Sequence, residues 1–110
     1  MQLVKQNKTG KAIKIVVEDD GKEIGRAWLY LIYNDLHKQP YGLMEDVFVE
    51  EEYRGSGIGS QLVKELIEEA KIQGCYKLIG CSRHSRPKVH KLYEDLGFVN
   101  YGVEFRMDLK

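Results

Sequence analysis

Apolar and β-branched residues come in short, strand-sized runs in the first half of the chain. Residues 11–18 and 23–33 are two such runs, and Asp19-Asp20-Gly21-Lys22 between them has the composition of a turn. This pattern predicts a β-hairpin. Residues 34–42 are polar and include a proline and a glycine, which predicts a loop, and residues 43–49 are predicted to form the next strand.

The apolar spacing changes to a helical period after residue 57. Apolar side chains then recur on one helical face until Gly74, a residue type that commonly ends a helix: Ile58, Leu62, Val63, Leu66, Ile67 and Ala70. Residues 76–81 are predicted to return to a strand. A strand, a helix and a strand in this order form a crossover unit, which should be right-handed and join two parallel strands.

One more helix and the closing strands are expected after residue 84. Ser85 is expected to cap a helix that carries Pro87 in its first turn and ends before Gly97. Its apolar face consists of Val89, Leu92, Tyr93 and Leu96. Residues 98–109 then predict one or two strands around Gly102. The fold class is α/β: a mixed, mostly antiparallel sheet with a central parallel strand pair and two main helices.

Length, charge and cysteine content limit the number of domains, the partners and the location that can be expected. The chain has 110 residues, 43% of them hydrophobic, so residues 1–110 are expected to form one domain with one modest core. Its 17 basic and 17 acidic residues cancel, which argues against nucleic acid or a membrane as the main partner. No run could span a membrane and no signal-peptide core is present, so a cytoplasmic location is expected. Cys75 and Cys81 match no metal, redox or disulfide spacing and are expected to be buried thiols.

The segment Arg54-Gly55-Ser56-Gly57-Ile58-Gly59-Ser60 joins a predicted strand to a predicted helix. Such a corner directs backbone N–H groups and the positive end of the helix dipole at one point, which favours a phosphate. Neither the dinucleotide fingerprint nor the Walker A motif fits, because Ser60 stands where glycine would be needed and no Gly-Lys-Ser/Thr ending is present. The alternative is a sharp corner without a ligand.

Two short motifs stand in order on the expected elements: Arg54, Gly57 and Gly59 at the strand-to-helix corner, and residues 92–98, Leu-Tyr-Glu-Asp-Leu-Gly-Phe, at the end of the second expected helix. They resemble the Gln/Arg-x-x-Gly-x-Gly/Ala signature and the aromatic and Gly-Phe signature of the GNAT superfamily of acyl-coenzyme A N-acyltransferases. The runs Glu45-Asp46-Val47-Phe48-Val49 and Gly74-Cys75-Tyr76-Lys77 extend the likeness from about Leu43 to the C-terminus.

The resemblance implies a binding site for acetyl-coenzyme A. Backbone groups of Val47, Phe48 and Val49 would hold the acyl carbonyl and the pantetheine arm like an added strand. The pyrophosphate would lie on the turn, whose implied binding residues are Arg54, Gly55, Ser56, Gly57, Ile58, Gly59 and Ser60. The usual asparagine of the second helix falls near Arg86, and Arg83, Arg86 and Lys88 either face the 3′-phosphate or are solvated.

The resemblance also implies two catalytic side chains. Tyr93 would protonate the departing thiolate, since a phenol stays neutral at pH 7; the alternative is a core aromatic on the helix face. Glu45 would take the proton of the ammonium through water, with Asp46 as its rival. Strand alternation puts these two on opposite faces, so at most one points at the acceptor, and a solvated acidic pair is the other interpretation.

The histidines do not change the predicted catalytic residues. His84 and His90 lack a third ligand at a suitable spacing, so no metal is expected. His37, in the 34–42 loop, is a weak candidate for the acceptor site.

The family's usual pair of helices between its first two strands is missing here, so the amine acceptor is expected to meet the 34–42 loop, a second subunit or an open site. Because the missing helices leave a face or an edge of the sheet less covered than usual, a homodimer is expected. The alternatives to an enzyme are a coenzyme A binding regulatory module and an interaction protein that uses the sheet edge near residues 103–109.

Overall fold

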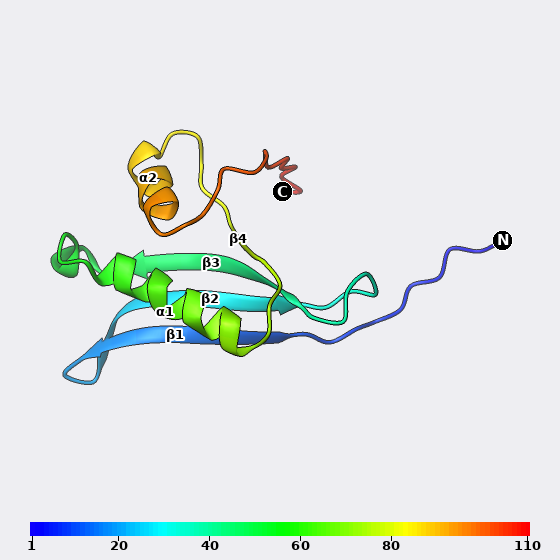
Figure 1. Cartoon of the computed structure of the whole chain (residues 1–110), viewed down its shortest axis with the longest axis horizontal. Coiled ribbons are helices and arrows are strands. Elements are labelled where there is room, and N and C mark those ends of the chain that lie inside the picture. Colours follow the sequence, from blue (N-terminus) through cyan, green and yellow to red (C-terminus); the bar gives the residue numbers. More distant parts are fainter. The chain divides into compact units, whose positions relative to one another are not determined.

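The computed structural model describes residues 1–110, which form two compact units, residues 1–79 and residues 80–110. The order of the elements is β1 (Lys11–Asp19), β2 (Lys22–Ile32), β3 (Tyr41–Val49), the short 3-10 helix η1 (Glu51–Tyr53), α1 (Ile58–Ile72), β4 (Leu78–Gly80) and α2 (Pro87–Asp95). The strands form one mixed sheet in the order β1-β2-β3-β4 (Figure 1). This confirms the predicted fold class.

The predicted hairpin is present between β1 and β2, which pair antiparallel from Lys11 opposite Leu31 to Asp19 opposite Lys22. Asp20 and Gly21 both have positive φ, 49° and 76°. A two-residue turn with two such residues has the twist that joins right-twisted antiparallel strands. The turn determines the register of the first two pairs, and a bulge between Val17 and Glu18 shifts the register of the remaining pairs by one residue.

Helix α1 lies along one face of the sheet (Figure 1). A Cβ on Gly25 would lie 3.3 Å from the Leu62 side chain and 3.5 Å from Ile58, so Gly25 and the residues in phase with it on β2 face the helix. The fully or nearly buried apolar side chains come from this interface: Ile24, Ala27, Leu29, Leu31, Met44, Val49, Leu62, Val63, Leu66 and Ala70. The apolar face that helical spacing predicts for α1 therefore packs against the apolar face that alternation predicts for the strands.

Strand β3 contains an irregularity that alternation alone does not predict. Its register with β2 shifts between Arg26 and Trp28, which lie opposite Phe48 and Glu45. Asp46 has φ of 52°, a left-handed conformation that is uncommon for a residue with a side chain. The expectation that Glu45 and Asp46 lie on opposite faces is wrong, because this bulge interrupts the alternation, and both carboxylates are exposed.

The second unit contains α2, which has Pro87 in its first turn as predicted. The predicted cap is wrong, because the N-cap residue is Arg86 and no side chain bonds to the free N–H groups there. Gly97, with φ of 102°, ends the helix, and the Phe98 N–H donates to the Tyr93 carbonyl at 2.9 Å. The rings of Tyr93 and Phe98 lie 5.4 Å apart.

The closing strands expected over residues 98–109 are absent, and no residue after Gly97 belongs to a helix or a strand. A strand requires backbone partners, and a favourable side-chain pattern does not supply them. Within this segment, Arg106 Nε lies 2.8 Å from Asp108 Oδ1. Without these strands, β4 ends the sheet order next to β3.

Smaller differences concern boundaries and cysteines. β3 begins at Tyr41, inside the predicted loop, and the strand predicted over residues 76–81 is limited to β4. The cysteines are not joined by a disulfide, but their expected burial is wrong, because Cys75 is half-buried and Cys81 is exposed. Burial raises the pKa of the Cys75 thiol, which lowers its reactivity at neutral pH.

Candidate functional site

The corner between β3 and α1 is held in place from both sides. Tyr53, at the end of η1, donates its hydroxyl to Asp19 at 2.7 Å and so ties the corner to the end of β1. Arg54 Nε donates to the Val49 carbonyl at 2.7 Å, and its guanidinium lies 5.3 Å from the centre of the Phe48 ring. These contacts fix the Arg54 side chain against the end of β3 and support a role for it in shaping the turn.

Two of the three glycines in this corner have a conformational reason to be glycine. Gly55 and Gly57 have φ of 86° and 87°, where a residue with a Cβ is strained, although no atom lies within 4 Å of where that Cβ would be. Gly59 lies in the first turn of α1 with no positive φ, and a Cβ there would make an ordinary 3.9 Å contact with Val49. The turn therefore depends on Gly55 and Gly57 for its shape and leaves Gly59 with space around it.

The backbone N–H groups of the corner are available to a ligand. The first backbone bond of α1 runs from the Gln61 N–H to the Gly57 carbonyl at 3.0 Å, so the N–H groups of Ile58, Gly59 and Ser60 precede the helical ladder. Gly55 and Gly57 donate to no backbone carbonyl, and Ser56 uses its hydroxyl to donate to Tyr53 O at 2.7 Å. An anion such as a pyrophosphate fits this set of donors.

The outer edge of β3 is free of a paired strand near the corner. The Gly42 N–H donates to the Lys77 carbonyl at 2.9 Å, which aligns the start of β4 with the start of β3. β4 has three residues and β3 has nine, so no strand accompanies β3 at Val47, Phe48 and Val49. An extended ligand could bond to this edge as an added strand does.

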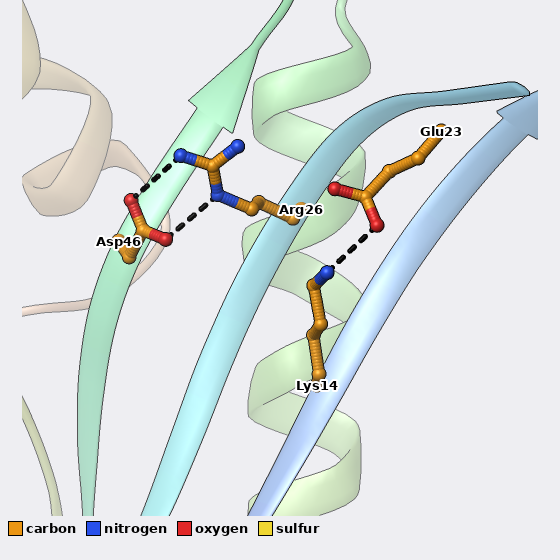
Figure 2. Close-up of polar contacts among 4 residues, drawn as sticks. All are labelled: Lys14, Glu23, Arg26 and Asp46. Atoms are coloured by element: carbon orange, nitrogen blue, oxygen red, sulfur yellow. Dashed lines mark hydrogen bonds and ion pairs between the residues drawn. The ribbon is translucent and has the colours of Figure 1, made fainter.

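Of the two candidate bases, Asp46 is already paired. Its carboxylate accepts from Arg26, with Nε to Oδ2 at 2.7 Å and Nη2 to Oδ1 at 3.2 Å (Figure 2). The hydrogen bond from Arg26 lowers the pKa of the Asp46 carboxyl, so this group is a poor proton acceptor at neutral pH. Glu45 is exposed and forms no hydrogen bond or ion pair, which leaves it as the available carboxylate.

The remaining predicted residues, Arg86 and Tyr93, belong to the second unit. Tyr93 lies on α2 against Phe98, and Arg86 precedes the helix. His90 Nε2 lies 2.7 Å from the Arg83 carbonyl, which gives this histidine a structural contact. No three His, Cys, Asp or Glu side chains are grouped as metal ligands, and no helix is long and apolar enough to cross a membrane.

Sequence reasoning missed the contribution of β2 to this region. Trp28 lies between Lys14 on β1 and Glu45 on β3, each directly opposite it in the register, on the face away from α1. Its ring stacks on Tyr30 with centroids 5.9 Å apart. The alternation of Arg26, Trp28 and Tyr30 with buried residues was the signal that could have identified this face.

Comparison with known proteins agrees with this architecture. The chain matches the model of the Acetyltransferase (GNAT) family over residues 3–98, and it belongs to that family. A crystal structure of a Trypanosoma brucei acetyltransferase superimposes with a TM-score of 0.78 at 32% identity, covering 89% of this chain and 69% of that one. The suspected family is therefore confirmed.

Two curated relatives have more specific names. Glucosamine 6-phosphate N-acetyltransferase of Trypanosoma brucei brucei is 41% identical over 68 residues, 62% of this chain and 44% of that protein. Thialysine N-epsilon-acetyltransferase of Bos taurus is 39% identical over 54 residues, 49% of this chain and 32% of that protein. The chain spans less than half the length of these relatives.

Proposed function

We propose that this protein is an N-acetyltransferase that moves an acetyl group from acetyl-coenzyme A to a primary amine. The observation that carries this proposal is the corner between β3 and α1, where Gly55 and Gly57 leave a row of backbone N–H groups available for a pyrophosphate. The free edge of β3 at residues 47–49 supplies a place for the pantetheine arm. Family membership supports acetyl-coenzyme A as the donor.

The transfer requires little from the protein because a thioester is already activated. The neutral amine nitrogen forms a bond to the thioester carbonyl carbon, the carbon–sulfur bond breaks, and the thiolate takes a proton. Tyr93 is the proposed source of that proton, and Arg86 is a proposed cofactor contact, both from the family resemblance. Glu45, exposed and unpaired, is the proposed acceptor of the ammonium's proton through water.

Calorimetric titration with acetyl-coenzyme A tests the cofactor site. Gly57→Glu introduces a carboxylate among the N–H donors and should abolish binding. Gly74→Glu is the matched control, since Gly74 also has positive φ and open space around it but lies after the other end of α1. Absence of binding by the folded wild type would refute the proposal, whereas binding without turnover of any amine would indicate a regulatory module.

We also propose a homodimer formed by antiparallel pairing of residues 101–109 of two copies. Tyr101, Val103, Phe105, Met107 and Leu109 alternate with Gly102 and charged residues, and all five are exposed. A pairing centred on Phe105 places Glu104 opposite Arg106 of the partner subunit, twice by symmetry. Sedimentation should show a dimer that Arg106→Glu dissociates and that the double swap with Glu104→Arg restores; monomer alone at high concentration would refute the pairing.

A further inference from the structure

The face of the sheet away from α1 has an aromatic centre with a carboxylate beside it. Trp28 is half-buried in the middle of this face, and Glu45 lies directly across from it on β3. Glu45 has no hydrogen-bonding or charged partner. The ammonium of Lys14 already lies over the Trp28 ring, with Nζ 5.7 Å from the ring centre, so Glu45 is the group beside Trp28 that still lacks a cation. A ligand ammonium would therefore bind to Glu45, on the side of Trp28 away from Lys14.

Both basic side chains of this face are already compensated. Lys14 Nζ lies 2.7 Å from Glu23, and Arg26 forms its two-bond contact with Asp46 (Figure 2). Arg54 lies at the margin, where its Nε is bonded to the end of β3. With these pairs formed, the uncompensated charge between the strands is the negative charge of Glu45.

An apolar hollow lies further along the strands from Trp28 and Glu45. It is open to solvent, has a volume of about 380 Å³ and is lined by Gly10, Lys11, Ala12, Tyr30, Leu31, Ile32 and Leu43. Tyr30 and Leu43 are directly opposite each other, two residues along their strands from Trp28 and Glu45. Two residues of a strand span about 7 Å, so a hydrocarbon chain of modest length would reach from Glu45 into the hollow.

We infer that the acceptor of the proposed acetyl transfer is an unphosphorylated aliphatic amine, whose ammonium lies between Glu45 and Trp28 and whose hydrocarbon part occupies the hollow beside Tyr30. This inference rests on the proposed function for the transfer step. A phosphorylated amino sugar, the substrate that the name of one relative indicates, would find Lys14 and Arg26 already paired with carboxylates, while Lys11 at the hollow donates to Gln73 at the end of α1. Its hydroxyl groups would also lose hydrogen bonds to water in an apolar hollow.

Fluorescence titration tests the inference without the cofactor, because Trp28 is the only tryptophan in the chain. The ligands are 1,5-diaminopentane, whose second ammonium would pass the open hollow and remain in solvent, and glucosamine 6-phosphate, each added to the full-length protein. The diamine should change the emission saturably, and glucosamine 6-phosphate should not over the same concentration range. Glu45→Gln should weaken diamine binding about tenfold by removing a charge-assisted hydrogen bond.

Two further variants make the test specific. Glu65→Gln removes an exposed, unpaired carboxylate on α1, which covers the opposite face, and should leave diamine binding unchanged. Asp46→Asn releases Arg26 while keeping a side chain that tolerates positive φ, and should raise the affinity for glucosamine 6-phosphate.

Several results would overturn the inference: binding of glucosamine 6-phosphate as tightly as the diamine, or an unchanged diamine affinity in Glu45→Gln. Turnover of glucosamine 6-phosphate but not of the diamine would also overturn it and leave acetyl transfer intact. Diamine binding that depends on Glu45 in a protein that does not bind acetyl-coenzyme A would support the ammonium site and refute acetyl transfer.

Discussion

Replacing Gly57 by alanine separates backbone strain from steric conflict at the proposed pyrophosphate site. Gly57 is the N-cap residue of α1 and has φ of 87°, yet no atom lies within 4 Å of the position of an added Cβ. The cost of Gly57→Ala is therefore conformational, and for an L-residue in the left-handed region it is about 1–2 kcal/mol. The free energy of unfolding should fall by this amount.

Gly59→Ala is the matched control two residues further along. The new methyl group would make an ordinary contact with Val49 at 3.9 Å, and α1 already has helical geometry at this residue. Alanine is favoured over glycine in a helix by roughly 0.5–1 kcal/mol, so this variant should be as stable as the wild type or slightly more stable. The two variants are expected to differ by about 2 kcal/mol.

Urea unfolding followed by circular dichroism measures this difference. With a denaturant slope of roughly 1–3 kcal/mol per molar urea, the midpoints of the two variants should be about 1 M apart. The Gly57→Ala variant should also bind acetyl-coenzyme A more weakly in calorimetry, because relaxing the strain rotates the N–H groups away from a common point. Equal midpoints for the two variants would show that the turn does not require a left-handed residue at position 57.

Three other changes test separate parts of the structure. Gly42→Ala should lower the free energy of unfolding by about 1–3 kcal/mol, because its Cβ would lie 2.9 Å from both Leu29 and Leu78; a midpoint in urea like that of the wild type would contradict this packing. Asp46→Asn should reduce the loss of folding stability at acid pH. Because the pKa of Asp46 is lowered in the folded protein, its carboxylate contributes fully to stability above the ordinary carboxyl pKa of about 3.9 and loses this contribution as pH falls through the folded pKa. Identical acid unfolding curves for the variant and the wild type would exclude this contribution. Tyr93→Phe should keep acetyl-coenzyme A binding and lose about 10²–10⁴-fold in turnover, whereas unchanged turnover would remove Tyr93 as the acid.

The local elements of this protein follow from its sequence because short-range chemistry specifies them. The Asp20-Gly21 pair determines the hairpin turn, the four-residue recurrence from Ile58 to Ala70 determines the buried face of α1, and Gly55 and Gly57 mark the corner. The family motifs lie on these same elements, so the proposed cofactor corner was identifiable from residues alone.

The tertiary structure decided what depends on partners distant in the sequence. The bulge at Asp46, its pairing with Arg26 twenty residues earlier, and the alignment of Trp28 with Glu45 all require β2 and β3 to be in register. Residues 98–109 show the opposite case: their alternation is ideal for a strand, but no other strand pairs with them. A side-chain period specifies which face of a segment is apolar, and only a neighbouring backbone makes that segment a strand.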